Sequence, residues 1–171
     1  GRNGATAPSE RIVVGAIGVG DRGRSVLSGF LPHKQCQVVA VCDVKSWALD
    51  KAKAMVDKAY GNTDCQTIAD FRELTARKDI DATLIASTDH WHVLHALSAV
   101  RGGKDVYVEK PLGLSLGQDK ALRKEVVKRK RIFQFGTQQR SGRNFRLACE
   151  LVRNGYIGKL KHVNVWAPAS A

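Results

Sequence analysis

Short apolar runs alternate with stretches of helical periodicity along most of this sequence. Residues 11–17 read Arg-Ile-Val-Val-Gly-Ala-Ile, which is typical of a strand buried on both faces of a parallel sheet. The apolar side chains over residues 26–31 recur at helical spacing, and Pro32 should end that helix. Residues 37–42, Gln-Val-Val-Ala-Val-Cys, form a second strand-like run. The chain therefore begins as a strand, a helix and a second strand.

The alternation continues through the rest of the chain. In the helix predicted over residues 115–130, the buried stripe should consist of Leu122, Val126 and Val127. Strands that alternate with helices in this way predict an α/β protein with a Rossmann-type doubly wound parallel sheet. The elements that we predict here are strands at 82–86, 106–109 and 132–136, helices at 90–100, 115–130 and 144–154, and a last strand at 161–166.

The composition is that of a soluble globular protein. With 171 residues, 43% of them hydrophobic and 26% charged, the chain can bury one good core. No apolar stretch reaches the length of a membrane span, and residues 1–10 are small and polar, so we expect them to be flexible. Because the chain starts without Met, a leader could have preceded residue 1. The compartment therefore stays open between the cytoplasm and, after export, the periplasm.

The net charge of +12 is large, so an anionic partner has to be considered. Nucleic acid is one candidate, but the densest basic run, over residues 123–131, lacks the aromatic side chains on which single-stranded bases stack. We expect these cations to lie on the solvated face of a helix. Attraction of an anionic cofactor and substrate is the more common use of such a field, so no nucleic acid is expected as a partner.

A glycine motif directly follows the first predicted strand. In a strand-turn-helix unit, the first glycine allows a tight turn, the second lets the backbone approach a pyrophosphate, and the third allows close packing of helix and strand. The N–H groups at the helix start then face the phosphates. The alternative is an ordinary glycine-rich loop. We expect a dinucleotide to bind at the six residues of the motif, Gly18, Val19, Gly20, Asp21, Arg22 and Gly23.

Asp43 follows the second predicted strand, about 20 residues after the last glycine of the motif, where dinucleotide-binding proteins carry an acid. A carboxylate at this point accepts hydrogen bonds from the adenosine ribose hydroxyls and repels a 2′-phosphate. The cofactor should therefore be NAD, with NADP disfavoured. Lys45 lies nearby with the opposite charge and weakens this preference.

Ligands of doubly wound sheets bind at the carboxyl ends of the strands, so further candidates follow the later strands. These segments are Ser87–His92, Glu109–Pro111 and Thr137–Arg140. His90 and His92 are two positions apart, which does not place them on one face of a helix, so we expect no metal pair. The four cysteines show no Cys-x-x-Cys pairing and are interpreted as reduced thiols.

The order of these motifs resembles the family of glucose-fructose oxidoreductase, inositol dehydrogenase and rhizopine-catabolism proteins, written Gfo/Idh/MocA. The resemblance runs from about Arg11 to Trp166. Its marks are the glycine motif at 18–23, the segment Ile80–His92, the triplet Glu109-Lys110-Pro111 and the segment Gly136–Arg140. Glu-Lys-Pro is the most specific of them.

The resemblance implies a catalytic residue, Lys110. In that family the Lys of Glu-Lys-Pro lies near the nicotinamide and the substrate hydroxyl. An amino group there can exchange a proton with an alcohol while hydride leaves the carbon, and Glu109 could orient it. The alternative is a lysine in a surface turn.

The resemblance also implies cofactor contacts beyond the glycine motif and Asp43. In the loop after the strand at 82–86, Thr88 stands where family members usually have Pro. The alternative for this loop is a helix start capped by Thr88 or Asp89, with Trp91 packed on the core. The further cofactor contacts that we expect are Ser87, Thr88, Asp89, His92, Glu109, Lys110 and Gln138.

Three parts are predicted: a flexible segment at 1–10, an NAD(P)-binding Rossmann domain at 11–141, and a remainder at 142–171. Family members carry a second domain, an α+β domain with an open antiparallel sheet that forms the sugar pocket. We interpret residues 142–171 as its connecting helix and first strand, in a chain that is truncated or completed by a partner chain. Alone, that strand would expose an unpaired edge and Trp166.

The predicted function is the NAD(P)-binding part of an oxidoreductase that transfers hydride between a nicotinamide cofactor and a sugar, cyclitol or related polyol. The full-length form should be a homo-oligomer. Two alternatives stay open. One is an NAD-dependent glycoside hydrolase of the same fold, which oxidises its substrate transiently and keeps its NAD bound. The other is a non-catalytic dinucleotide-binding module.

Overall fold

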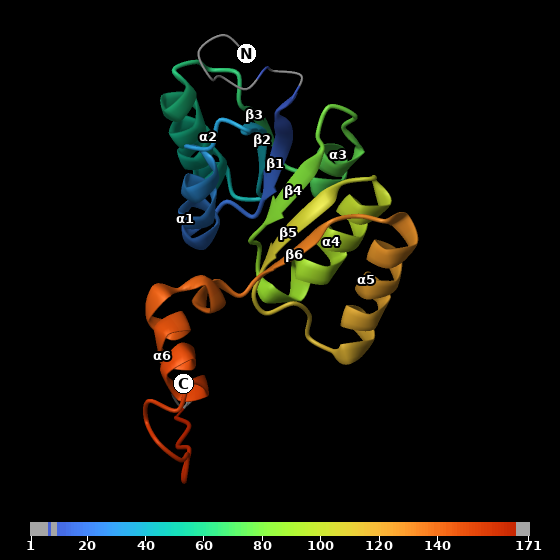
Figure 1. Cartoon of the computed structure of the whole chain (residues 1–171). Helices are drawn as coiled ribbons and strands as arrows, with labels where there is room; N and C mark the ends of the chain where they lie inside the picture. The colour runs from blue at the N-terminus through green and yellow to red at the C-terminus, as the bar shows by residue number, and fades with distance from the viewer. Residues whose placement is uncertain (1–6, 8–9, 167–171) are drawn as a thin grey trace. The chain divides into compact units, whose positions relative to one another are not determined.

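The computed structural model describes residue 7 and residues 10–166, and in this part of the chain it contains one six-stranded sheet (Figure 1). All pairings are parallel, and the strand order is β3-β2-β1-β4-β5-β6. The order reverses between β1 and β4, which is the doubly wound arrangement predicted from the sequence. The strands are β1 (Ile12–Ile17), β2 (Cys36–Cys42), β3 (Gln66–Ile68), β4 (Ala82–Ile85), β5 (Asp105–Glu109) and β6 (Phe133–Gly136).

Helices cover both faces of the sheet (Figure 1). α1 (Asp21–Phe30) and α2 (Ser46–Tyr60) pack on one face, where Leu27 and Val56 belong to one buried apolar cluster. The opposite face is covered by α3 (Phe71–Ala76), α4 (His92–Arg101) and α5 (Leu116–Arg129). Two cores on either side of one sheet explain why its central strands are apolar runs without alternation.

The helix expected over residues 115–130 is present as α5, and Ser115 caps it by accepting a hydrogen bond from the Gln118 N–H at 3.3 Å. The predicted buried stripe was partly wrong. Leu122 is buried and Val126 packs against the core, whereas Val127 is 67% exposed. Five residues separate Val127 from Leu122, which is about 140° around a helix axis, so the two cannot share a narrow buried face.

Three elements between β2 and β4 were not predicted: α2, β3 and α3. α2 buries small side chains, Ala48 and Ala52 together with Val56, which are spaced by four residues. Alanines give a weak periodic signal because their hydropathy is modest. β3 is three residues long and α3 is six. These lengths are too short for the two-residue alternation of a strand or the 3.6-residue repeat of a helix to be recognised in the sequence.

The chain divides into two compact units, residues 1–136 and residues 137–171. The second unit contains the short 3-10 helix η4 (Gln138–Ser141) and α6 (Arg143–Arg153). The strand predicted over 161–166 was wrong, because the structure describes these residues and assigns no strand to them. A strand exists only through hydrogen bonds to a neighbour, and Val165 and Trp166 are 87% and 84% exposed.

The carboxyl ends of β1, β2, β4 and β5 meet at one edge of the sheet, as parallel strands require. The segments that follow them are therefore neighbours in space although far apart in sequence. No helix in the described part of the chain is both long and apolar enough to cross a membrane.

Candidate functional site

The turn between β1 and α1 packs tightly against the end of β4. Gly18 has a φ of +79°, and a Cβ added to it would lie 2.3 Å from the Ser87 nitrogen. A Cβ added to Gly23 would lie 1.9 Å from the Gly18 carbonyl oxygen. Glycine is therefore required at both positions, for the turn and for the close approach of α1.

Gly20 differs from the other two glycines because a Cβ there would meet nothing within 4 Å. Gly20 is also the N-cap of α1 and provides no side-chain acceptor for the N–H groups of the first helical turn. Open space above a glycine, next to uncapped N–H groups, fits a phosphate group. The turn thus fits the pyrophosphate of a dinucleotide at the place the sequence indicated.

Asp43, at the end of β2, lies directly beside this turn. One carboxylate oxygen accepts a hydrogen bond from the Val19 N–H at 2.9 Å, and the other accepts one from the Lys45 N–H at 3.0 Å. Each oxygen can accept a second hydrogen bond. The structure therefore brings Asp43 and the glycine turn together, as the sequence spacing predicted.

Trp47, in the first turn of α2, is a neighbour of Asp43 that sequence reasoning missed. Its indole is 44% exposed, and three cationic groups lie within 6 Å of the ring. Arg24, Lys45 and Lys51 are 5.6, 5.8 and 5.4 Å from the ring centre, respectively. Arg24 also bonds Asp21 at 2.5 Å, so part of this charge is neutralised. The surface beside Asp43 is thus aromatic and basic.

The loop after β4 contains Ser87, whose hydroxyl lies 3.0 Å from Nδ1 of His95 on α4. His95 is buried between the rings of Phe71 and Trp91. Burial, followed by the charges of His92 and Arg72, lowers the pKa of His95 to about 4. The ring is therefore neutral at pH 7 and fixes the Ser87 side chain at the strand end.

Thr88 and Asp89 are both exposed in the same loop. Thr88 is the N-cap of the 3-10 helix η3 (Asp89–Trp91) but makes no capping hydrogen bond with its side chain. Trp91 is 38% exposed and stacks on His95, so it packs at the margin of the core. Contacts of Thr88 and Asp89 with a cofactor stay predictions.

His92 lies inside the molecule, with 1% of its surface exposed. Its Nδ1 is 2.6 Å from the Pro111 carbonyl oxygen, and its Nε2 is 3.0 Å from the Ser87 carbonyl oxygen. The ring therefore joins the loop after β4 to the loop after β5. A direct contact between His92 and the cofactor, which we expect from the sequence, stays a prediction.

Glu109 and Lys110 follow each other at the end of β5. The Glu109 carboxylate is buried, and Arg22 Nη2 bonds its Oε1 at 2.6 Å. This hydrogen bond raises the pKa of Arg22 above its ordinary value. The pKa of Tyr107 is raised as well, first by burial and then by the Glu109 charge. The Lys110 side chain is exposed, so an amino group is available beside a buried acid.

Gln138 belongs to the second unit, in η4, and its part in cofactor binding stays a prediction. Within residue 7 and residues 10–166, no cluster of three or more His, Cys, Asp or Glu side chains could hold a metal ion. All four cysteines are free thiols. Burial raises the pKa of Cys42 to about 12 and that of Cys65 to about 11, so neither thiol is a reactive thiolate at pH 7.

Comparison with solved structures places the fold among inositol dehydrogenases. The chain superposes on myo-inositol 2-dehydrogenase from Lactobacillus plantarum with a TM-score of 0.77 and 27% identity, over 87% of this chain and 43% of that one. For scyllo-inositol dehydrogenase from Lactobacillus casei, solved with bound NAD(H) and scyllo-inositol, the TM-score is 0.76 and the identity 27%, over 86% and 42% of the two chains.

Sequence relatives include proteins named for glycoside hydrolysis. The chain is 39% identical over 112 residues to a glycosyl hydrolase family 109 protein of Saccharopolyspora erythraea, which covers 64% of this chain and 24% of that protein. It is 29% identical over 167 residues to alpha-N-acetylgalactosaminidase of Shewanella oneidensis, which covers 93% of this chain and 36% of that protein. The chain thus spans less than half the length of the relatives that it matches.

A family model described as "Oxidoreductase family, NAD-binding Rossmann fold" matches residues 12–137. The match covers all six strands and the turn at 18–23 that fits a pyrophosphate. This chain therefore belongs to the Gfo/Idh/MocA oxidoreductase family and contains its NAD-binding Rossmann domain.

Proposed function

We propose that this chain binds NAD in preference to NADP, and that the protein uses it to transfer hydride to or from a sugar, cyclitol or related polyol. The observation that carries the proposal is the Asp43 carboxylate, which lies against the Val19 N–H beside the glycine turn. The pyrophosphate would lie over Gly20, and Asp43 would accept hydrogen bonds from the adenosine ribose hydroxyls. Binding of scyllo-inositol and NAD(H) by the Lactobacillus casei enzyme supports the polyol class.

Two opposing charges act on the choice between NAD and NADP. The Asp43 carboxylate repels a 2′-phosphate, whereas Lys45 and Lys51 near Trp47 attract it. Asp43 is held in the turn by two backbone hydrogen bonds, whereas a lysine ammonium is a flexible, well-hydrated charge. A carboxylate fixed in position should outweigh mobile, hydrated lysine charges, which supports NAD.

In the reaction that we propose, Lys110 transfers the proton and NAD, when bound, accepts the hydride from the substrate carbon. The exposed amino group of Lys110, when neutral, would take the proton from the substrate hydroxyl. Its backbone N–H bonds Oε2 of the buried Glu109 at 3.2 Å. Glu109 would thus hold the backbone of Lys110 while its side chain reaches the substrate.

Calorimetric titration with NAD and, separately, NADP tests the cofactor preference. We expect NAD to bind at least about tenfold more tightly than NADP, and D43A to lose about tenfold in NAD affinity, which corresponds to roughly 1.4 kcal/mol. D50A removes an exposed carboxylate of α2 and should change neither affinity. Tighter binding of NADP, or equal loss in D43A and D50A, would contradict the proposal.

The role of Lys110 is tested in the full-length gene product with a panel of polyols. K110A should lose turnover by several orders of magnitude while its NAD affinity stays within about twofold, because proton transfer and cofactor binding are separate contributions. Normal turnover in K110A would contradict the catalytic role. Size measurement on the same product tests the expectation of a homo-oligomer.

A second candidate function is glycoside hydrolysis with NAD as a bound catalyst. It is favoured by the relatives named glycosyl hydrolase family 109 protein and alpha-N-acetylgalactosaminidase. In that case the full-length protein should purify with NAD already bound and should cleave an aryl α-N-acetylgalactosaminide. A dehydrogenase would instead exchange NAD freely and produce NADH with a polyol. Reaction with neither substrate class would favour a non-catalytic dinucleotide-binding module.

A further inference from the structure

Arg22 and Glu109 form an ion pair across the carboxyl edge of the sheet. Arg22 lies on α1, in the turn that follows β1, and Glu109 ends β5. Their closest atoms, Nη2 and Oε1, are 2.6 Å apart. Because β4 lies between β1 and β5, the pair spans the end of β4, where the strand order reverses. A ligand at the switch point of the sheet would lie against this pair.

The two partners of the pair differ in exposure. The Glu109 side chain is 3% exposed, whereas that of Arg22 is 48% exposed. A buried carboxylate needs a charged partner, because an unpaired charge in the interior is strongly unfavourable. The guanidinium has five N–H donors in a planar fork, and the bond to Glu109 uses Nη2. Its exposed side can therefore contact an anion while it still neutralises Glu109.

The same carboxylate holds the backbone of Lys110. Oε2 of Glu109 accepts a hydrogen bond from the Lys110 N–H at 3.2 Å. On the other side of Lys110, His92 contacts the Pro111 carbonyl at 2.6 Å. The backbone is thus held on both sides of Lys110, while the Lys110 side chain itself is exposed.

We propose that Arg22 is a positioning residue that couples dinucleotide binding at the glycine turn to the placement of Lys110. This inference rests on the proposed function. A pyrophosphate over Gly20 would lie two residues from Arg22 and would share the guanidinium with Glu109. Any shift of the guanidinium changes how Glu109 holds the Lys110 N–H. By reciprocity, fixing Lys110 and Glu109 favours the turn that binds the nucleotide.

The experiment measures the reactivity of Lys110 with and without NAD. This chain is acetylated briefly with a low concentration of acetic anhydride, and peptide mass spectrometry gives the labelling of Lys110 relative to Lys124. Lys124 is an exposed lysine on α5 and acts as an internal reference. NAD binding is measured on the same samples by calorimetry. The variants are R22M, R22K and E109Q, with R123M on α5 as the matched control, and circular dichroism verifies their folding.

In the wild-type chain and in R123M, saturating NAD should slow the acetylation of Lys110 by about fivefold or more relative to Lys124. R22M at saturating NAD should lose most of this protection even though NAD is bound. R22K keeps the positive charge but lacks the planar set of N–H donors, so it should retain part of the protection that R22M loses. A pair that only stabilises the fold would change thermal stability without changing the NAD dependence of Lys110 labelling. If R22M does not fold, E109Q, which removes the carboxylate charge of the pair, provides the comparison and should likewise lose most of the protection.

The outcomes separate the inference from the proposed function. If the wild-type chain shows protection and R22M shows the same protection at saturation, the coupling is refuted and the proposed function stands. If the wild-type chain binds NAD but Lys110 is not protected, the coupling is also refuted, and dinucleotide binding stands. If the wild-type chain does not bind NAD, the proposed function fails and the inference fails with it.

Discussion

The three glycines of the turn have different neighbours, so a side chain should have a different effect at each. At Gly23 a Cβ would overlap the Gly18 carbonyl oxygen, whereas at Gly20 it would meet open space. We expect G23A to destabilise the fold by about 3 kcal/mol or more, through overpacking. G20S should leave stability unchanged or raise it by up to about 1 kcal/mol, because Ser caps a helix well. Its hydroxyl would nevertheless occupy the phosphate space, so NAD affinity should fall about tenfold.

Thermal unfolding and calorimetric titration check both expectations. The control is G29A, in the last turn of α1, where a Cβ also meets nothing within 4 Å. G29A should raise stability by about 0.5–1 kcal/mol through helix propensity and leave NAD binding unchanged. NAD affinity in G20S equal to that of the wild-type chain would show that the phosphates lie elsewhere.

At the scale of single residues, sequence spacing predicted contacts between residues that are close in sequence or belong to one motif. Asp43 lies beside the glycine turn because a strand-turn-helix-strand unit has little freedom in its geometry. The partners of Arg22 and His92 could not be predicted in the same way. Glu109 is 87 residues from Arg22 and Pro111 is 19 residues from His92, and both contacts depend on strand order and side-chain rotamers.

At the scale of an element, the buried His95 on α4 should make the free energy of unfolding depend on pH. The pKa of His95 is lowered from about 6.5 to about 4, mainly by burial. Between these values the unfolded chain binds a proton that the native chain does not, so stability is complete above pH 6.5 and falls as the pH drops toward 4. Between pH 7 and pH 4.5 we expect this group to account for a loss of roughly 1–3 kcal/mol.

Urea unfolding at both pH values, on the wild-type chain and on H95Q, measures this loss. The Gln amide keeps a polar partner for Ser87 but does not titrate in this range. H95Q should start less stable, because the ring stack is removed, and should lose less stability on acidification. If the two proteins lose the same free energy, His95 is not responsible for the pH dependence.

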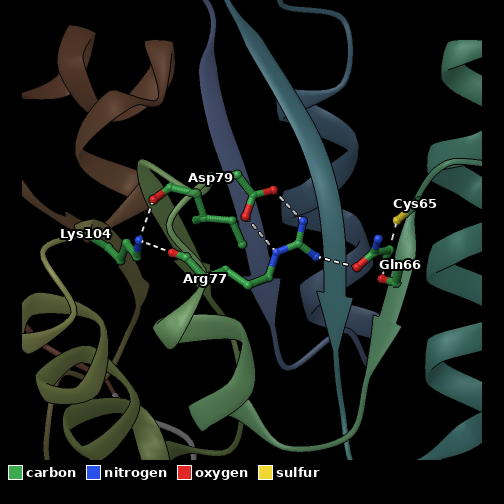
Figure 2. A network of polar contacts seen from close by, with 6 residues as sticks. Cys65, Gln66, Arg77, Asp79 and Lys104 are labelled. Atoms are coloured by element: carbon green, nitrogen blue, oxygen red, sulfur yellow. Dashed lines mark hydrogen bonds and ion pairs between the residues drawn. The ribbon is translucent and has the colours of Figure 1, made fainter.

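Lys104 joins β5 to the segment between α3 and β4 (Figure 2). Its ammonium group is buried and donates to the carbonyl oxygens of Arg77 and, at 2.7 Å, of Ile80. Arg77 in turn bonds Asp79 and Gln66 with its guanidinium. Burial lowers the pKa of Lys104, because the interior disfavours the charged form. The two carbonyl groups would otherwise lack a donor at the end of α3.

We expect K104M to lower the free energy of unfolding by about 1–3 kcal/mol, because it leaves buried carbonyl oxygens without their donor. Chemical denaturation gives this value. K78M removes an exposed lysine of the same connecting segment and should change stability by less than about 0.5 kcal/mol. Equal stability of K104M and the wild-type chain would mean that the carbonyl groups find other donors.

Elements with strong patterns could be predicted from the sequence, and weak ones could not. β1, β2 and α5 have long apolar runs or a clear cap, and the structure places them close to the predicted bounds. β3 is held by its pairing with β2 rather than by its own sequence. The strand expected over 161–166 shows the converse: an alternating pattern alone does not make a strand without a neighbour.

At the scale of the whole molecule, the first unit contains both buried apolar clusters, whose residues all lie within 13–135. Stability should therefore reside in this unit. A chain ending at residue 141 should unfold within about 3 °C of the 171-residue chain and bind NAD with similar affinity, since α6 contributes no buried residue. Thermal scans and titrations of both chains provide the comparison. A much lower unfolding temperature would show that residues 142–171 stabilise the sheet.

The strand order also determines how the chain folds during synthesis. β1 emerges from the ribosome before the other strands, yet it lies inside the sheet, with β2 and β3 added on one side. The other edge of β1 stays unpaired until β4 has been synthesised and pairs with residues 14–17. Until Ile85 has emerged, the nascent chain carries an apolar strand with one open edge, which is a hazard for aggregation. Pairing with β4 covers this edge of β1 but leaves the far edge of β4 open until β5 has emerged, so a chaperone would have an apolar edge to protect until the second half of the sheet has formed.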